Sequence, residues 1–336
     1  MKRNLPIDIV VTWVDGSDPA WRAKKEKYTG VKVCEGNTEV RYRDWDTLRY
    51  WFRGVEKYAP WVRYVWFVTD GQKPEWLNID HPKLKWVKHS DFVPGEYLPT
   101  FNANTIEWNL HRIEGLAEQF VYFNDDVFMI RETKPEDFFV NSFPCDFPGV
   151  GLLYPADFFS YLIFNNIQLL NRHFSLRRSI RENWKKWIFH QKPIDILKLV
   201  WYGRRDLIPG IKGYHLHIPY RKETFRTLWT QEGQLIHETC THRLRTREDI
   251  TSWCVRDWRL LAGDFYPKKP CGRYFLTSEI KNNGALEYIL KQKGNVVCLN
   301  DTESEDDFEE HRRLILDTFE QLLPEKSAFE IQIPDC

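Results

Sequence analysis

Short apolar runs alternate with amphipathic segments along the first 130 residues. Residues 7–14, 62–69, 83–89 and 120–123 are rich in β-branched and aromatic side chains and predict four strands. Residues 44–58 and 103–119 carry apolar side chains at helical spacing and predict two amphipathic helices. Strands that alternate with helices are typical of an open α/β sheet with helices on both faces, Rossmann-like or glycosyltransferase-A-like in class.

The pattern changes after residue 148. Residues 149–214 are aromatic and basic and predict a helical insertion, whereas a short apolar run at 296–299 and an amphipathic acidic segment at about 305–323 predict one more strand and helix. We therefore expect a catalytic α/β core formed by residues 1–148 and 215–336. The insertion at 149–214 would interrupt it.

The net charge of zero hides an asymmetry along the chain. Residues 165–226 contain 14 Lys and Arg against 4 Asp and Glu, and residues 301–336 contain 12 Asp and Glu against 3 Lys and Arg. Two interpretations stay open: the basic segment packs on the acidic one, or it faces an anionic acceptor or a membrane surface. For the membrane interpretation, the residues expected to seat a helix in the lipid interface are Trp184, Trp187, Ile188 and Trp201.

Several classes of protein are disfavoured. No run of about 20 apolar residues is available for a membrane helix, and no Gly-x-x-x-x-Gly-Lys-Ser/Thr loop or Gly-x-Gly-x-x-Gly fingerprint occurs. The seven cysteines are scattered without a Cys-x-x-Cys pair, which favours a reducing compartment. We expect a cytoplasmic protein, peripheral at the inner face of the cell membrane in the membrane interpretation, with no nucleic-acid partner.

Acidic turns follow three of the four predicted strands. They contain Asp15 with Asp18, Asp70, and Asp125 with Asp126. Such turns are often acidic for local hydrogen-bonding reasons, but carboxyl ends of parallel strands share one edge of a sheet, where ligands bind. Adjacent carboxylates at Asn124-Asp125-Asp126 are oxygen ligands suited to Mg²⁺ or Mn²⁺ beside a diphosphate.

Two further segments offer groups for proton and phosphate chemistry. His215-Leu216-His217 is expected to place two imidazoles on one face of an extended segment, although two ordinary hydrogen-bonded histidines would fit as well. The cations of Thr241–Asp249, Arg245 among them, suit phosphate oxygens. The same segment also fits a helix start, with Thr246 as its cap.

The chain resembles the Stealth family of sugar-1-phosphate transferases, which includes bacterial capsular polysaccharide phosphotransferases and the catalytic subunit of the lysosomal-enzyme N-acetylglucosamine-1-phosphotransferase. Four blocks carry the resemblance: Ile7–Pro19; a series from Arg41-Tyr42-Arg43-Asp44 to Tyr122-Phe123-Asn124-Asp125-Asp126; His217-Ile218-Pro219 to Glu248-Asp249; and Cys298-Leu299-Asn300-Asp301 with Pro324–Glu330. Asp44-Trp45-Asp46-Thr47 departs from the Asp-Asn-Asp-Glu that the family often has, which puts any carried-over role of Trp45 and Thr47 in doubt.

The resemblance implies a UDP-hexose or UDP-N-acetylhexosamine donor, an oligosaccharide or polysaccharide acceptor, and Mg²⁺ or Mn²⁺. It assigns catalysis to Asp8, His217 and Arg245, and metal binding to Asp125, Asp126 and Asp301. The positions it implies for substrate binding are Trp13, Asp15, Arg43, Asp44, Asn102, His111, Arg112, Asn124 and His242.

The expected reaction is transfer of the sugar-1-phosphate group to a hydroxyl of the acceptor, with UMP leaving and a phosphodiester formed in capsular or cell-surface polysaccharide. Phosphoryl transfer needs alignment and charge neutralisation more than covalent help. Arg245 would bind non-bridging oxygens and His217 would deprotonate the hydroxyl. A phospho-histidine at His217 is a second route, and a metal-dependent glycosyltransferase that releases UDP is the alternative function.

Overall fold

The computed structural model describes residues 5–29, 42–154, 156–302 and 305–331. Its main sheet has five strands in the order β3-β2-β1-β4-β8. Strands β1, β2, β3 and β4 are parallel and β8 runs antiparallel beside β4. Their bounds are β1 Ile7–Thr12, β2 Val65–Thr69, β3 Leu84–Lys88, β4 Gln119–Asn124 and β8 Ile218–Arg221. The predicted α/β class and the four predicted strands are confirmed.

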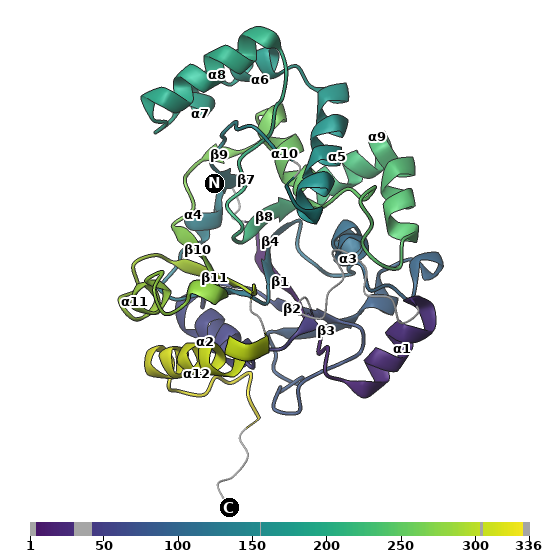
Figure 1. Ribbon diagram of the computed structural model, residues 1–336, viewed down its shortest axis with the longest axis vertical. Helices are drawn as coiled ribbons and strands as arrows, with labels where there is room; N and C mark the ends of the chain where they lie inside the picture. Colours follow the sequence, from purple (N-terminus) through teal and green to yellow (C-terminus); the bar gives the residue numbers. More distant parts are fainter. Residues whose placement is uncertain (1–4, 30–41, 155, 303–304, 332–336) are drawn as a thin grey trace, which may run out of the picture.

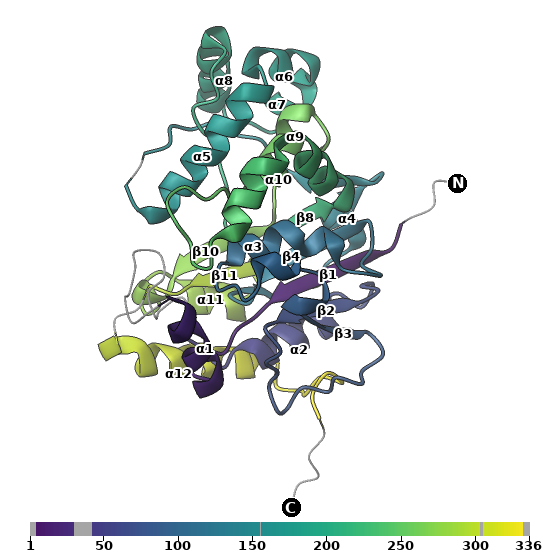
Figure 2. The ribbon, with the colours of Figure 1, turned by 90° about the vertical axis from the view of Figure 1, so that its right-hand side faces the viewer.

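Alternate side chains of the sheet enter two separate cores. From β1, Ile9 and Val11 pack on one side with Trp51 of α2 (Leu48–Tyr58), while Val10 packs on the other side with Trp108 of α3 (Ala103–Asn109). Burial on both faces explains why these strands read as continuous apolar runs. Figure 2 shows α2 and α12 (Glu305–Leu322) on one side of the sheet and α3, α9 (Lys222–Thr241) and α10 (Trp253–Ala262) on the other.

Smaller elements complete the core. A second sheet has the order β10-β11-β5 and a third has the order β6-β7-β9. The strands are β5 Val127–Met129, β6 Phe139–Val140, β7 Phe143–Asp146, β9 Tyr266–Pro267, β10 Gly272–Leu276 and β11 Val296–Asn300; the helices are α1 Pro19–Thr29, α4 Pro135–Phe138 and α11 Ala285–Leu290. The run at 296–299 is thus a strand, but it lies in the second sheet. The helix expected at 103–119 is shorter, because α3 ends at Asn109 and a 3-10 turn follows at Leu110–Arg112.

Residues 149–214 form the predicted helices. They are α5 Phe158–His173, α6 Leu176–Glu182, α7 Trp184–Ile188 and α8 Pro193–Arg205. Buried side chains of this segment, such as Leu170 and Trp187, share one core with Leu228 of α9 and Leu260 of α10. The inserted helices and the helices that follow them therefore pack as a single lobe on one side of the sheet.

The two oppositely charged segments lie far apart. Figures 1 and 2 place α6, α7 and α8 at one end of the molecule and the acidic helix α12 near the other. Helix α12 packs against the α2 side of the core through Ile315 and Phe319. The interpretation in which the basic insertion packs on the acidic helix is therefore wrong.

Candidate functional site

The carboxyl ends of β1 and β4 lie side by side. Thr12 is paired with Asn124 in the parallel ladder, so the loops that follow these two residues leave the sheet together. The loop after β1 carries Asp15, and the turn after β4 carries Asp125 and Asp126. This is the edge where an open α/β sheet binds its ligands.

Five aspartates form one electrostatic group at this edge. Burial and the neighbouring charges of Asp126 and Asp44 raise the pKa of Asp125 to about 8. Burial and the charge of Asp15 raise the pKa of Asp44 to about 6. Burial also raises the pKa of Asp126, and the charge of Asp301 adds to the effect. The structure thus brings together Asp15, Asp44, Asp125, Asp126 and Asp301, whereas Asp70, expected here from its place after a strand, pairs with Lys24 at 2.6 Å.

Asp301 is held by the segment between α1 and α2. Arg43 donates from Nε to Oδ2 at 3.1 Å and from Nη2 to Oδ1 at 3.0 Å, and the indole of Trp45 donates to Oδ2 at 2.9 Å. Trp45 is therefore part of the site, a role that its departure from the family pattern had placed in doubt. Arg41, the first residue of the same motif, lies outside the described residues.

The surroundings of Asp126 fit a divalent cation. Among the described residues, Oδ1 of Asp126 is buried without a hydrogen-bond partner, while Oδ2 accepts from the thiol of Cys298 at 3.6 Å. Ligand atoms of Asp126, His215 and Cys298 all lie within 4.8 Å of one another. A buried carboxylate oxygen without a partner, beside further repelling carboxylates, is an arrangement that a cation would stabilise. Sequence reasoning missed His215 and Cys298 as members of this group, although both lie in segments that it examined.

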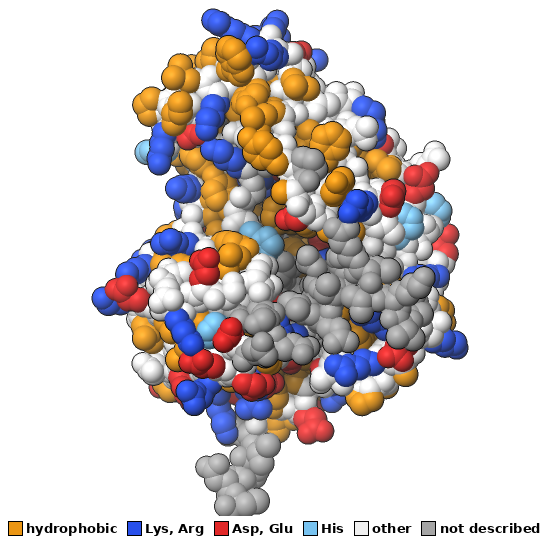
Figure 3. Space-filling view, viewed as in Figure 1, with side chains coloured by type: hydrophobic (Ala, Val, Ile, Leu, Met, Phe, Trp, Pro, Cys, Tyr) orange, Lys and Arg blue, Asp and Glu red, His pale blue; other side chains and the backbone are white. Residues whose placement is uncertain are grey.

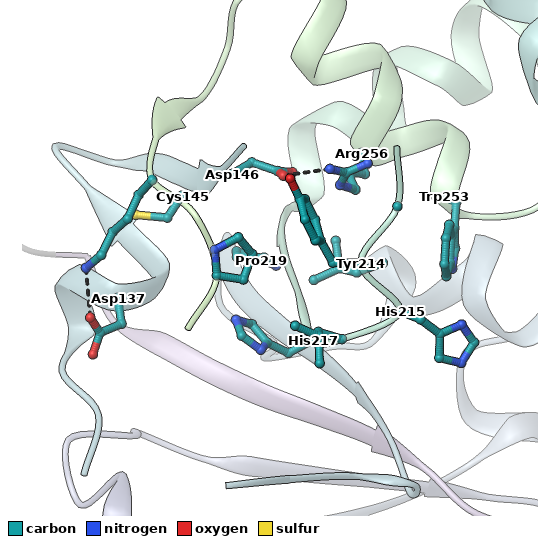
Figure 4. Close-up of a pocket in the computed structure, with 14 residues that line it drawn as sticks. Asp137, Cys145, Asp146, Tyr214, His215, His217, Pro219, Trp253 and Arg256 are labelled. Atoms are coloured by element: carbon teal, nitrogen blue, oxygen red, sulfur yellow. Dashed lines mark hydrogen bonds and ion pairs between the residues drawn. The ribbon is translucent and has the colours of Figure 1, made fainter. Parts of the chain in front are cut away.

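The two histidines do not share one face, contrary to the expectation from sequence. His215 has a positive φ of 47°, so the segment is not extended there and the two rings diverge, as Figure 4 shows. His215 lies between Trp253 and Tyr274, at 5.6 and 5.1 Å between ring centroids. The side chains of residues 215 and 217 therefore do not point to the same side, as they would in a regular strand, because the backbone turns at His215.

His217 lies inside the molecule. Its ring stacks on Phe123 at 5.4 Å and meets Phe138 edge-on at 4.9 Å. Burial lowers its pKa to about 4, so the imidazole is neutral at physiological pH. Its Nδ1 is buried and has no partner among the described residues.

A pocket opens beside both histidines (Figure 4). Asp146 lies on its wall and accepts hydrogen bonds from Arg256 and Arg259, both at 2.8 Å. Although burial raises the pKa of Asp146, the charges of the two arginines outweigh it and hold the pKa below its usual value. The wall of the pocket is therefore fixed by a paired, buried ion cluster.

A second polar cluster surrounds buried Asp249. His242 Nδ1 lies 2.6 Å from Asp249 Oδ1, and the Asn102 amide donates to Oδ2 at 2.7 Å. Asn102 also caps α3 by accepting from the backbone of Asn104. The backbone of Phe101, next to Asn102, accepts from Tyr42, which in turn binds the loop of Asp15 through Gly16. Asn102 and His242 therefore lie on the same edge as the aspartates.

Arg245 lies near the same edge. Burial raises the pKa of Glu107, and a hydrogen bond from Ser252 and the nearby charge of Arg245 act against this shift. Glu107 also accepts from the Tyr122 hydroxyl at 3.2 Å, and that hydroxyl lies 2.9 Å from Oγ1 of Thr12, the last residue of β1. These contacts connect Glu107, on whose pKa the charge of Arg245 acts, to the end of the central strand.

Asp8 lies at the opposite end of β1. It is fully buried and binds Arg63 through both oxygens, at 2.8 and 2.6 Å. The Trp66 indole and the backbone N–H of Ala117 also donate to it, at 2.9 and 2.8 Å. Asp8 is the second residue of β1, whereas the aspartates lie beyond the last residue of that strand. Its hydrogen bonds therefore stabilise the fold at a distance from the aspartates.

The side chains of three residues expected to bind substrate pack against aromatic rings instead. Trp13 is buried against Phe67 in the core. Burial and the charge of Arg112 lower the pKa of His111 to about 3, and its ring stacks on Phe225 of α9. The Arg112 guanidinium lies over Trp229. The structure does not bring these side chains to the aspartates.

Comparison with known proteins shows a family likeness over nearly the whole chain. The sequence matches "Stealth protein CR1, conserved region 1" over residues 5–30, conserved region 2 over 41–145 and conserved region 4 over 287–335. It is 40% identical to a capsular polysaccharide phosphotransferase WcwK of Streptococcus pneumoniae, covering 96% of this chain and 98% of that protein. It is 37% identical to the receptor polysaccharide phosphotransferase WefC of Streptococcus oralis, covering 97% and 99%.

A third relative is the exopolysaccharide phosphotransferase cps2G of Lactiplantibacillus plantarum, 35% identical and covering 96% of each chain. Among solved structures, apo mouse xyloside xylosyltransferase 1 is similar with a TM-score of 0.37 and 10% identity, over 88% of this chain and 98% of that one. So low a likeness carries no argument about fold or activity.

Proposed function

We propose that this chain, which belongs to the Stealth protein family, transfers hexose-1-phosphate or N-acetylhexosamine-1-phosphate from a UDP-sugar to a hydroxyl of an oligosaccharide or polysaccharide acceptor. Its relatives over nearly the full length are phosphotransferases of capsular, receptor and exopolysaccharides. The chain is accordingly an enzyme, a phosphotransferase. The proposal adds the UDP-sugar donor, UMP as the leaving group, and a role in capsular or cell-surface polysaccharide synthesis.

The observation that carries the proposal is the buried Oδ1 of Asp126, which has no hydrogen-bond partner among the described residues and lies within a group of mutually repelling carboxylates. Crowded carboxylates cost free energy unless a positive charge compensates them, and a site for a diphosphate needs such a charge. We propose Mg²⁺ or Mn²⁺ held by Asp125 and Asp126, with Asp301 nearby. When bound, the cation would neutralise charge on the donor diphosphate.

The remaining steps belong to side chains on the same edge. We propose that Arg245 binds non-bridging phosphate oxygens through its guanidinium. The acceptor oxygen attacks the sugar-bearing phosphorus, the bond from that phosphorus to the UMP oxygen breaks, and the sugar keeps its C1–O bond. We assign the hydroxyl proton to His217, whose imidazole is neutral at physiological pH because burial lowers its pKa to about 4, a shift that also makes the ring a weaker base. Asp8 then serves the fold rather than the reaction.

The cellular place of the enzyme is also a proposal. Within the described residues, no helix combines the length and apolar character needed to cross a bilayer. We propose that the enzyme works in the cytoplasm, at the inner face of the cell membrane, as a peripheral protein.

The deciding experiment identifies the nucleotide product. The purified protein is incubated with a panel of UDP-sugars, Mg²⁺ and an oligosaccharide acceptor, and the nucleotides are separated by chromatography. The proposal requires UMP in step with product and a phosphodiester signal in the phosphorus NMR spectrum. UDP in step with a phosphate-free product would instead identify a glycosyltransferase, even if every site residue proved essential.

A further inference from the structure

Exposed apolar side chains gather on the helical lobe. Eleven of the nineteen large apolar side chains that the described part of the chain exposes lie between residues 152 and 207. Figure 3 shows apolar side chains at the end of the molecule where α6 to α8 lie, with Lys and Arg side chains among them. Large contiguous apolar surface is unusual on a protein without a partner and marks an interaction site.

Helix α8 has its apolar stripe turned outward. It packs inward through buried Leu199 and Gly203. Ile194, Leu197 and Trp201, spaced three and four residues apart on one face, are 56%, 64% and 56% exposed. A helix that only served the core would bury this stripe and expose polar residues.

Helix α7 and the residues after it also expose large apolar side chains. Trp184 is 51% exposed and Phe189 is 40% exposed, whereas Trp187 is fully buried and belongs to the core. Trp187 is therefore not available to a lipid interface, contrary to the expectation from sequence. We define the α7–α8 patch as Trp184, Ile188, Phe189, Ile194, Leu197, Val200 and Trp201.

Cations surround the α7–α8 patch. Residues 176–205 contain nine Lys and Arg against two Asp and Glu. The guanidinium of Arg205 lies 3.8 Å from the centre of the Trp201 ring, and the Lys185 ammonium lies 5.7 Å from that of Trp184. Aromatic rings beside Lys and Arg are the composition of segments that lie in the headgroup region of an anionic bilayer.

We propose that the α7–α8 patch is a docking surface for an anionic lipid bilayer, with Trp201 and Leu197 entering the interface and the cations contacting headgroups. Charge complementarity selects this occupant, because a second copy docked through the same patch would bring two strongly positive surfaces together. The inference deepens the proposed peripheral placement by naming the surface responsible. It concerns binding alone and does not depend on which bond the enzyme cleaves.

The test is co-sedimentation of the full-length protein with vesicles of phosphatidylglycerol and phosphatidylcholine, with no donor or acceptor present. We expect binding at low salt that falls as salt rises, and little binding to pure phosphatidylcholine. The double variant Leu197→Ser/Trp201→Ser should lower the partition coefficient at least about tenfold. The matched control Leu290→Ser changes a side chain that is 42% exposed on α11, outside the patch, and should bind as the wild type does.

A second variant tests the charge separately from the apolar stripe. Arg204→Gln/Arg205→Gln should weaken binding to phosphatidylglycerol vesicles and reduce its dependence on salt. Absence of binding by the wild type at low salt, or binding by both variants as strong as that of the wild type, would overturn the proposal. So would a change from dimer to monomer in the Leu197→Ser/Trp201→Ser variant without vesicle binding, because the patch would then join two copies. Circular dichroism on the same preparations shows that each variant is folded, and UMP release measured beside it tests phosphotransfer independently.

Discussion

Arg43 binds Asp301 through two parallel hydrogen bonds, 258 positions away in the sequence. The planar guanidinium matches the carboxylate in a way that an ammonium does not. Arg43→Lys should therefore lower UMP release by about 10–100-fold, the usual effect of losing a group that orients a metal-site carboxylate. Arg178→Lys changes an exposed pair with Glu182 and is the matched control. Equal rates for the two variants would show that the orientation of Asp301 is unimportant.

Asp125 makes the stability of the cation-free protein depend on pH. Because its pKa is raised to about 8, the stability it contributes is complete below its unfolded value near 4 and is lost as pH rises through 8. Asp125→Asn removes this titration, so the variant should become more stable than the wild type as pH increases from 6 to 9. Thermal unfolding in the presence of a chelator measures the difference.

The same titration predicts the effect of Mg²⁺. A cation binds the ionised carboxylate, so the increase in melting temperature on adding Mg²⁺ should grow from pH 6 to 9 in the wild type. In Asp125→Asn, the increase in melting temperature on adding Mg²⁺ should be much smaller at every pH in this range. An increase that is independent of pH in the wild type would contradict the assignment of Asp125 to the cation.

Asp126 lies in the turn after β4 and Asp8 lies within β1, and their substitutions should act differently. Asp126→Asn keeps the shape of the side chain but removes its charge, so UMP release should fall by about 10²–10³-fold or more while the fold survives. Turnover at the wild-type level in limiting Mg²⁺ would rule out Asp126 as a ligand.

Asp8→Asn should unfold more easily without a comparable defect in the folded enzyme. The variant leaves Arg63 without its carboxylate and disturbs a buried group of four donors. Loss of the hydrogen bonds to the buried carboxylate should cost about 1–3 kcal/mol, because Asp8 is fully buried whereas the Arg63 side chain is 35% exposed and stays hydrated. Denaturant unfolding measures this cost. A wild-type unfolding midpoint together with lost turnover would return Asp8 to the catalytic residues.

The sequence predicted the sheet and its acidic edge for physical reasons that are local. Apolar strands followed by Asp-rich turns indicate a parallel sheet, and parallel strands must end at one edge, which places Asp15 beside Asp125. The pattern could not tell which end of β1 carries chemistry, so Asp8 was assigned to the site although it stands at the far end. The net charges of two segments also do not predict whether the segments pack together. The basic helices α6 to α8 and the acidic helix α12 lie apart although their charges are opposite.

Side-chain direction depends on single backbone angles that the pattern does not record. A period of two predicted that His215 and His217 face one way, but the positive φ of His215 turns its ring toward Asp126. Cys298 was not predicted because a buried thiol in the middle of an apolar strand is typical of a core residue. Trp45 belongs to the site through its hydrogen bond to Asp301, which is 256 positions away in the sequence. The local sequence pattern does not predict a contact between residues so far apart.

The two histidines provide the sharpest test of the proposed chemistry. His217→Ala should lower turnover by about 10²–10⁴-fold, the usual contribution of a general base, with donor binding by calorimetry largely unchanged. Because burial lowers the pKa of His217 to about 4, protonation of this ring should not reduce kcat/KM between pH 7 and 5.5. His215→Ala removes a group beside Asp126 instead, so it should raise the Mg²⁺ concentration needed for half-maximal rate more than it lowers the rate at saturation. If His215→Ala abolished turnover at saturating Mg²⁺ while His217→Ala stayed active, the proton acceptor would be His215, and His217 would have only a structural role.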